Sequence, residues 1–299
     1  MKSDVGIIGL GIMGSAISAS LIDESYPVYG FDIDPGRNEA LTRRGGTALA
    51  SAREVATRAA IVVTSLPDVA ALQDVCKGDD GVVAAGRPGL LLIETSTLPL
   101  DVKCDARATL QQAGVTALDC PLSGTGAQAR VRDLAVYASG DAAAVARCRP
   151  VFEAFARSVH YLGDFGNGTR MKLVANLLVA IHNVSAAEAF VLGMKAGLDA
   201  TKIYEVIKDG AGSSRMFEVR GPMMVDGRYD DATMRVDMWQ KDMQIIADFA
   251  RELGCPAPLL SAAAPIYTEA QAEGRGRQDT AAVCAVLERL AGFSREPAN

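Results

Sequence analysis

The sequence lacks the cysteine patterns that would indicate a disulfide framework or a zinc site. It contains no Cys-x-x-Cys pair, and neither of its two histidines lies at zinc-ligand spacing from a cysteine. The six thiols are scattered along the chain as Cys76, Cys104, Cys120, Cys148, Cys255 and Cys284. We therefore expect reduced cysteines in a cytoplasmic protein, and we expect no bound metal.

Basic charge and long apolar runs are also scarce. The 30 basic and 36 acidic residues give a formal net charge of -6, which supplies no basic stripe for a phosphate backbone. No window holds about 18 uninterrupted apolar residues, the length of a membrane-spanning helix. Near the N-terminus, Asp4 and four early glycines disrupt the pattern of a secretory signal. We expect neither a nucleic-acid partner nor a membrane span.

The composition is instead that of an ordinary globular protein. Hydrophobic residues make up 49% of the chain and charged residues 22%, which excludes a disordered or fibrous chain. At about 100–200 residues per domain, a length of 299 residues indicates two domains.

Short apolar runs alternate with helical patterns through the first half of the chain. The segment after the first run carries Met13, Ile17 and Leu21 at helical spacing. Strands that alternate with helices in this way form a mostly parallel sheet covered by helices, so we predict an α/β domain over residues 1–164. The predicted strands are Val5–Gly9, Val28–Phe31, Ile61–Val63, Leu90–Ile93 and Val115–Leu118.

The second half has a different pattern. Apolar residues recur at intervals of three and four from Gly166 to Ala196 without a proline, which predicts a helix of about 46 Å at about 1.5 Å per residue. That length exceeds a crossover helix, so we predict an interdomain helix over residues 166–196 that begins an all-helical domain, residues 165–299. Further helices are predicted at Ala200–Lys208, Val236–Leu253, Pro258–Glu273 and Thr280–Leu290.

A glycine-rich turn follows the first predicted strand. Its pattern is Gly-x-Gly-x-x-Gly, in which the first glycine permits a tight turn, the second lets the backbone approach a pyrophosphate, and the third allows close helix packing. The pyrophosphate would bind at a helix N-terminus, where N–H groups and the helix dipole favour anions. The turn predicts a doubly wound Rossmann domain that binds a dinucleotide. Its residues are Gly9, Leu10, Gly11, Ile12, Met13 and Gly14.

Asp32 ends the second predicted strand, 18 residues after the last fingerprint glycine. A carboxylate at this place accepts hydrogen bonds from the adenosine ribose hydroxyls and repels a 2′-phosphate. Arg37 is the counterargument, since its guanidinium could reach a 2′-phosphate, although it also fits a solvated charge on the following helix. We expect NAD as the cofactor in preference to NADP.

Several further motifs stand in a fixed order along the chain, and together they resemble those of the β-hydroxyacid dehydrogenase family. That family includes 3-hydroxyisobutyrate, L-threonate and tartronate-semialdehyde enzymes and, more distantly, 6-phosphogluconate dehydrogenase. The resemblance covers nearly the whole chain. Beyond the fingerprint, its motifs are Ser65-Leu66-Pro67-Asp68, Glu94-Thr95-Ser96-Thr97, Asp119-Cys120-Pro121-Leu122-Ser123-Gly124, Gly166-Asn167-Gly168 with Lys172 and Asn176, and Lys241-Asp242.

The resemblance implies roles for these residues. In the family a Leu-Pro turn and a Ser-Thr pair line the dinucleotide, a Ser-Gly-Gly turn binds the substrate carboxylate, and the lysine of Gly-x-Gly-x-x-x-Lys is catalytic. By resemblance Lys172 is therefore catalytic, Asn176 holds the substrate, and Lys241 closes the site near the nicotinamide. The implied cofactor residues are Leu66, Pro67, Ser96 and Thr97, and the implied substrate residues are Ser123, Gly124 and Thr125.

Some positions depart from the family pattern. Thr125 replaces the third residue of Ser-Gly-Gly, Ala175 the first of an Asn-Asn pair, and Glu94 the aspartate of Asp-x-Ser-Thr. Thr125 could alter the substrate pocket, because a β-branched residue adopts fewer turn conformations than glycine and adds a hydroxyl. Val179 stands where 6-phosphogluconate dehydrogenases carry a proton-donating glutamate, so we do not expect decarboxylation by that route.

Lys172 suits the oxidation of an alcohol by hydride transfer. The hydroxyl proton must leave to a base, and a lysine serves only if its pKa falls from about 10.4 toward about 7–8. Burial and the charges of Lys241 and the oxidised nicotinamide could lower the pKa of Lys172. Asn176 shares its helix face one turn on. The turn at Ser123 and Gly124 offers donors to a carboxylate, which implies a small 3-hydroxy acid as substrate.

We therefore expect NAD-dependent oxidation of a small 3-hydroxy acid, or the reverse reduction, with Lys172 as general base and acid. Two alternatives stay open. One is an NADPH-dependent reductase of the glyoxylate or succinic-semialdehyde type, which Asp32 opposes. The other is a non-catalytic dinucleotide-binding protein, which Lys172 and Asn176 oppose. The resemblance also implies a homodimer or homotetramer.

Overall fold

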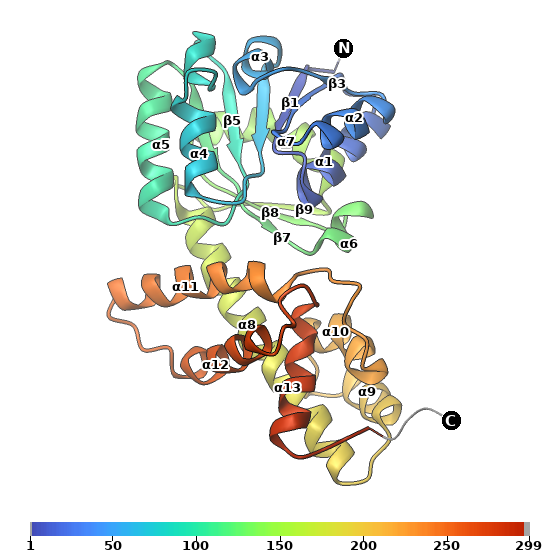
Figure 1. The fold of residues 1–299 in the computed structure, drawn as a ribbon. Coiled ribbons are helices and arrows are strands. Elements are labelled where there is room, and N and C mark those ends of the chain that lie inside the picture. Colours follow the sequence, from blue (N-terminus) through green and yellow to red (C-terminus); the bar gives the residue numbers. More distant parts are fainter. Residues whose placement is uncertain (1, 296–299) are drawn as a thin grey trace. The chain divides into compact units, whose positions relative to one another are not determined.

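Six parallel strands form the main sheet of the first part of the chain (Figure 1). In the computed structural model, which describes residues 2–295, their order is β3-β2-β1-β4-β5-β6. This is the strand order of a Rossmann domain, so the predicted doubly wound, parallel sheet is confirmed. The strands are β1 (Val5–Ile8), β2 (Val28–Phe31), β3 (Thr47–Ala48), β4 (Ile61–Thr64), β5 (Leu91–Glu94) and β6 (Thr116–Asp119).

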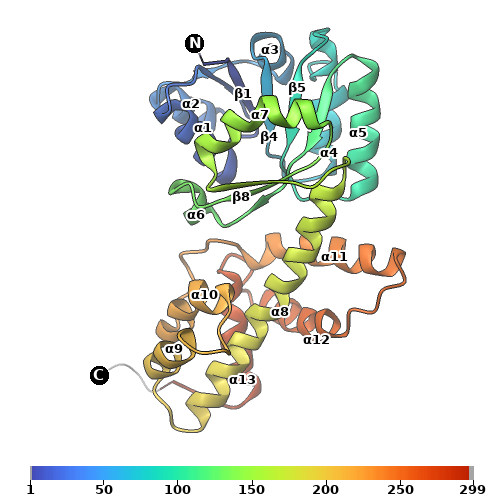
Figure 2. The ribbon, with the colours of Figure 1, turned by 180° about the vertical axis from the view of Figure 1, so that it is seen from behind.

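Helices cover both faces of this sheet. Val5 and Ile7 of β1 belong to a buried cluster with α1 and α7, whereas Ile8 belongs to a second cluster with α3, α4 and α5. Figure 2 shows α7 crossing one face. Because both faces are buried, the strands are continuous apolar runs, which is why the sequence revealed them. The helices are α1 (Ile12–Asp23), α2 (Pro35–Arg43), α3 (Ala52–Arg58), α4 (Val69–Lys77), α5 (Leu100–Gln112), α6 (Gly126–Arg130) and α7 (Ala142–Phe155), with a short turn η1 (Val83–Ala85).

A second, three-stranded sheet follows the first. Strand β8 (Ala135–Ala138) pairs antiparallel with β7 (Leu122–Ser123) and parallel with β9 (Ser158–Tyr161). Strands as short as β7 and β3 show no readable alternation of apolar residues, and the sequence did not predict them.

The second part of the chain is helical, as predicted. The long helix α8 extends over Asn167–Lys195, within one residue of the prediction at each end. Helix α10 (Arg215–Asp226) was not predicted, because it contains Gly221 and Pro222, which normally interrupt a helical pattern. The remaining helices are α9 (Ala200–Lys208), α11 (Val236–Glu252), α12 (Pro258–Ala272), η2 (Thr280–Ala282) and α13 (Val283–Leu290).

Helix α8 supplies apolar side chains to the core of this helical part. Phe190 of α8 stacks on Phe217 of α10 with ring centroids 5.2 Å apart, and Leu173 and Ala180 are buried in the same cluster. Within residues 2–295, α8 is the one helix long and apolar enough to cross a membrane, with 44% of its most apolar window buried. The core helix of a soluble protein meets the same criterion, so this is weak evidence for a span.

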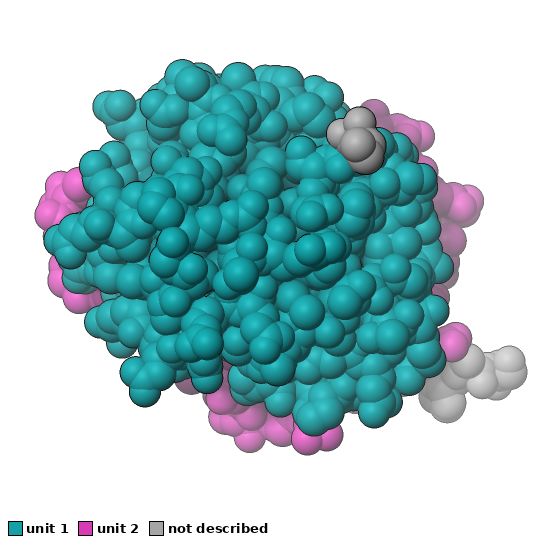
Figure 3. Space-filling view, turned by 90° about the horizontal axis from the view of Figure 1, so that it is seen from above, with its two compact units in different colours: residues 1–172 teal, residues 173–299 magenta. Residues whose placement is uncertain are grey.

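The chain divides into two compact units, residues 1–172 and residues 173–299, which Figure 3 colours teal and magenta. The division falls inside α8, so Lys172 is the last residue of the first unit and Asn176 belongs to the second. The domain boundary between residues 164 and 165 stays a prediction.

Candidate active site

The three fingerprint glycines form a tight turn between β1 and α1. Gly9 has a φ of 89°, and a Cβ there would lie 2.2 Å from the carbonyl oxygen of Ser65. A Cβ on Gly14 would lie 1.9 Å from the carbonyl oxygen of Gly9. Both positions therefore require glycine, the first for its backbone conformation and both for close approach.

Gly11 has a different environment from Gly9 and Gly14. A Cβ there would meet a single atom within 4 Å, Nη1 of Arg37 at 3.7 Å. Among the described residues no side chain caps the N-terminus of α1, whereas Asp34 caps α2 and Asp68 caps α4. Open space over Gly11 and an uncapped helix N-terminus suit a pyrophosphate, so this turn fits a dinucleotide.

Asp32 lies directly after β2 and is 7% exposed. Its Oδ2 accepts a hydrogen bond of 2.7 Å from the N–H of Leu10, and its Oδ1 accepts one of 2.9 Å from the N–H of Asp34. Arg37 is half exposed and forms ion pairs with Oδ2 of Asp32 at 3.2 Å and Oδ2 of Asp34 at 3.4 Å. The carboxylate is thus fixed beside the fingerprint, with its guanidinium partner on the solvent side.

The predicted cofactor residues Leu66, Pro67, Ser96 and Thr97 follow β4 and β5 directly. The N–H of Leu66 donates to Oγ of Ser96 at 2.8 Å, which joins the two loops. Strand order reverses between β1 and β4, and ligands of doubly wound sheets bind at such a switch point beyond the carboxyl ends of the strands. The structure brings these loops to the same edge of the sheet as the fingerprint turn.

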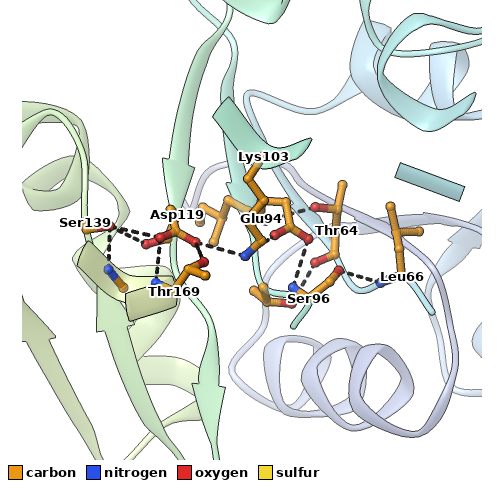
Figure 4. A network of polar contacts seen from close by, with 11 residues as sticks. Thr64, Leu66, Glu94, Ser96, Lys103, Asp119, Ser139 and Thr169 are labelled. Carbon is orange, nitrogen blue, oxygen red and sulfur yellow. Dashed lines mark hydrogen bonds and ion pairs between the residues drawn. The ribbon is translucent and has the colours of Figure 1, made fainter. Parts of the chain in front are cut away.

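Next to these loops lies a buried row of charged side chains that the sequence analysis did not identify (Figure 4). Lys103 of α5 is 1% exposed, and its Nζ lies 2.6 Å from Oε2 of Glu94 and 2.9 Å from Oδ1 of Asp119. Burial alone would lower the pKa of Lys103, but the two carboxylates outweigh it and hold that pKa above its usual value. Removing one partner from such a buried set typically costs about 3–5 kcal/mol.

The predicted substrate turn lies between β7 and α6. Gly124 has a φ of 138°, and a Cβ there would lie 2.5 Å from Cδ2 of Leu134. Thr125 caps α6 in a reciprocal pair with Gln128, since its hydroxyl accepts from the N–H of Gln128 and its own N–H donates to Oε1 of Gln128. The threonine thus has extended backbone and a capping role, which explains how a β-branched residue fits at this position. The N–H groups of Thr125 and Gln128 are engaged in the cap.

Helix α6 packs against the start of α1. A Cβ on Gly126 would lie 2.4 Å from Cγ2 of Ile12, so a larger residue would displace the Ile12 side chain. The predicted substrate turn therefore lies beside the dinucleotide turn within the first unit.

The start of α8 is anchored to the sheets by hydrogen bonds. Thr169 donates its N–H to Oδ2 and its hydroxyl to Oδ1 of Asp119, both at 2.7 Å, and the N–H of Gly168 donates to Oγ of Ser139 at 2.9 Å. A Cβ on Gly168 would lie 2.4 Å from the carbonyl oxygen of Tyr137. Half-buried Lys172 follows Thr169 by three residues on α8.

In the second unit Asp242 links two predicted site residues. Nδ2 of Asn176 on α8 donates to Oδ2 of Asp242 at 3.2 Å, and Nζ of Lys241 lies 3.4 Å from Oδ1 of Asp242. Asn176 and Asp242 are 3% and 6% exposed. The sequence analysis assigned no role to Asp242 beyond its place in the Lys241-Asp242 motif. Nothing local to α11 indicates a hydrogen bond to a residue 66 positions earlier.

Two family models match the chain. Residues 4–163, more than half of the chain, match the NAD binding domain of 6-phosphogluconate dehydrogenase, and residues 166–287 match the NAD-binding model of NADP-dependent 3-hydroxyisobutyrate dehydrogenase.

Individual relatives cover the chain almost completely. L-Threonate dehydrogenase of Cupriavidus necator is 33% identical over 96% of this chain and 97% of its own length. The crystal structure of 3-hydroxyisobutyrate dehydrogenase from Salmonella typhimurium is 34% identical, covers 95% of this chain and 100% of its own, and superposes with a TM-score of 0.86. The Mycobacterium tuberculosis 3-hydroxyisobutyrate dehydrogenase with L-serine is 30% identical, covers 96% of this chain and 99% of its own, and gives a TM-score of 0.85.

The parallel sheet, the glycine turn and the matching models together define an oxidoreductase that uses a nicotinamide dinucleotide. Within that class, the chain belongs to the β-hydroxyacid dehydrogenase family.

Proposed function

We propose that this protein oxidises the hydroxyl group of a small 3-hydroxy acid with NAD, or reduces the corresponding semialdehyde or 3-oxo acid, with Lys172 as general base and acid. The observation that carries the proposal is the packing of α6 on α1 through Gly126 and Ile12. An acid bound at Ser123 and Gly124 would lie next to a dinucleotide bound at the fingerprint. Relatives named for L-threonate and 3-hydroxyisobutyrate support this substrate class.

Each residue would have a separate task. The nicotinamide ring, when bound, accepts or supplies the hydride. The Ser123 hydroxyl and the Gly124 N–H bind the substrate carboxylate. Lys172 takes the hydroxyl proton during oxidation and returns it during reduction. Asn176 gives one N–H to Asp242 and has a second N–H and a carbonyl oxygen with which to hold the substrate. Lys241, which the family resemblance assigns to the cofactor, would supply positive charge to it.

NAD is the proposed cofactor. The buried carboxylate of Asp32 stands at the end of β2, where it would accept hydrogen bonds from ribose hydroxyls and repel a 2′-phosphate. Arg37 is paired with Asp32 and Asp34, so its charge is already balanced by carboxylates. The remaining proposed contacts are those of Leu66, Pro67, Ser96 and Thr97 with the dinucleotide.

An NADPH-dependent reductase of the glyoxylate or succinic-semialdehyde type is the second candidate. The half-exposed Arg37 favours it, because a guanidinium beside the ribose site is the group that holds a 2′-phosphate. The matching model for residues 166–287 also carries the name of an NADP-dependent enzyme.

We also propose a homodimer or homotetramer in the cytoplasm. Helix α8 exposes Val174, Leu178 and Leu192, at 51%, 50% and 74%, and large apolar side chains along one helix favour a partner subunit.

The test is the appearance of reduced cofactor with NAD and with NADP across a panel of hydroxy acids. The panel contains L-threonate, 3-hydroxyisobutyrate, L-serine, D-glycerate and 4-hydroxybutyrate. We expect one or more of these acids to be oxidised, with NAD giving a kcat/KM at least about tenfold above NADP. A preference for NADP would favour the second candidate. Binding of NAD without oxidation of any acid of the panel would contradict the proposed function.

A further inference from the structure

Lys103 is buried to a degree that is exceptional for a lysine. It is 1% exposed and lies in the first turn of α5 (Leu100–Gln112), where an ammonium group opposes the helix dipole. Both its burial and its position are unfavourable unless carboxylates compensate for them. The proposed chemistry gives Lys103 no task, so its place needs another explanation.

On one side, Lys103 reaches the dinucleotide loops. Its Nζ lies 2.6 Å from Oε2 of Glu94, whose Oε1 accepts the N–H of Ser96 at 2.8 Å. Oγ of Ser96 in turn accepts the N–H of Leu66 at 2.8 Å. One carboxylate oxygen of Glu94 thus pairs with the Lys103 ammonium, and the other accepts the N–H of Ser96 in the loop after β5.

On the other side, Lys103 reaches the start of α8. Its Nζ lies 2.9 Å from Oδ1 of Asp119, and the same carboxylate accepts the N–H and the hydroxyl of Thr169. Ser139 also donates to Asp119 and accepts the N–H of Gly168. In the first turn of α8, Asp119 therefore accepts the N–H of Thr169 directly, and Ser139 accepts that of Gly168. The negative charge of Asp119 also complements the helix dipole.

Figure 4 shows these groups as one continuous row, with Lys103 between Glu94 and Asp119. We propose that Lys103 is a positioning residue, which holds the first turn of α8, and with it Lys172, in register with the dinucleotide loops at Leu66 and Ser96. The inference rests on the proposed function of Lys172. Without the ammonium, two buried carboxylates would face each other without a cation. The repulsion is relieved when one carboxylate takes up a proton or the two move apart, and either change at Asp119 weakens its hold on Thr169.

The test compares Lys103→Met with Arg220→Met. Both variants remove the cation of a buried ion pair, since Arg220 is 2% exposed and pairs with Asp279 at 3.1 Å in the second unit. Both are expected to lower the melting temperature. Only Lys103→Met is expected to release the first turn of α8.

Two readouts separate positioning from plain destabilisation. The first is hydrogen exchange of the folded proteins, in which the amides of residues 168–172 should lose about tenfold or more of their protection in Lys103→Met and keep it in Arg220→Met. The second is turnover of the best acid of the panel above. We expect kcat of Lys103→Met to fall at least about tenfold, with KM for the acid changed by less than about threefold, because the proton acceptor moves while the carboxylate turn stays.

The proposal would be overturned if Lys103→Met showed the same hydrogen exchange at residues 168–172 and the same kcat as Arg220→Met. If the wild-type protein oxidises no acid of the panel, the proposed function fails, and the exchange of residues 168–172 alone decides whether Lys103 holds this turn.

If Lys103→Met does not fold, Thr169→Val tests the same link with all three charges in place. Loss of its hydroxyl bond to Asp119 should raise exchange at residues 168–172 and lower kcat in the same sense. Unchanged exchange and kcat in Thr169→Val would count against the proposal.

Discussion

Asn176 of α8 and Asp242 of α11 share a hydrogen bond of 3.2 Å between two buried side chains. The bond links two motifs that lie 66 residues apart in the sequence, and Lys241 meets the same carboxylate. Asp242 therefore fixes the orientation of the amide that we assign to the substrate.

Replacement of Asp242 by alanine should leave the Asn176 amide without its buried acceptor. An unsatisfied buried donor costs about 1–3 kcal/mol of stability. The amide would also lose its fixed orientation toward the substrate, so we expect kcat/KM to fall about tenfold to a hundredfold. Steady-state kinetics with the best acid of the panel would measure the change. Asp248→Ala is the matched control, because Asp248 lies on the same helix with an exposed side chain. Equal losses of kcat/KM in the two variants would show that Asp242 does not orient the Asn176 amide for catalysis.

Asp32→Asn should shift cofactor preference. The change removes the buried charge that repels a 2′-phosphate and leaves Arg37 with one carboxylate partner, Asp34, in place of two. We expect the ratio of NAD to NADP affinities to fall by about tenfold or more, which corresponds to about 1.4 kcal/mol. Titration of both cofactors by calorimetry measures the ratio. Asp34→Asn also removes one ion pair of Arg37 but keeps the cap of α2 and the carboxylate of Asp32, so it should change the ratio less than Asp32→Asn does. A parallel loss of affinity for both cofactors in Asp32→Asn would contradict the role given to this carboxylate.

Gly124→Ala should damage substrate binding more than cofactor binding. An alanine at position 124 would have to adopt a φ of 138°, and its Cβ would lie 2.5 Å from Cδ2 of Leu134. Backbone strain of this kind costs about 1–3 kcal/mol. We expect KM for the acid to rise about tenfold while the affinity for NAD changes by less than about threefold.

Gly86→Ala is the control for this experiment. Gly86 also has a positive φ, 57°, but a Cβ there would meet no described atom within 4 Å. A comparable rise in KM in Gly86→Ala would show that a general loss of stability, and not the turn at Gly124, is responsible.

The buried thiol of Cys148 should make the fold sensitive to alkali. Burial raises its pKa from 9.0 to about 12. The raised value means that the stabilising contribution is complete below pH 9.0 and is lost as the pH rises toward about 12, by about 1.4 kcal/mol per pH unit for each such thiol. Urea unfolding at a series of alkaline pH values measures this loss. Cys148→Ala should weaken the pH dependence, whereas replacement of the exposed Cys104 by alanine should not. Identical slopes in all three proteins would refute the assignment.

The sequence was most informative where one local pattern determines the structure. The apolar run from Val5 predicted β1 because both faces of the sheet are buried, and Gly9, Gly11 and Gly14 predicted the turn because their spacing follows from its geometry. The long helix was visible because α8 packs apolar residues along 29 residues. In each case the relevant neighbours are close in the chain.

The sequence was least informative where the partners are distant. No local pattern distinguishes Lys103 from other lysines on helices, and its contacts with Glu94 and Asp119 form only in the folded chain. The sequence predicted an altered substrate pocket at Thr125 but not that its hydroxyl caps α6 through Gln128. Helix α10 was not predicted because Pro222 lowers its local helix propensity. Tertiary packing of Phe217 and Met224 stabilises the helix nevertheless.

The most direct test of the account is the Lys172→Ala variant, measured for turnover and for NAD binding in the same preparation. Loss of the proposed base should lower kcat by about a hundredfold or more while the Kd for NAD changes by less than about threefold. Arg170→Ala, which removes an exposed cation two residues away on α8, should retain both properties. Turnover by Lys172→Ala at the level of Arg170→Ala would contradict the central claim, because another group would then carry the proton.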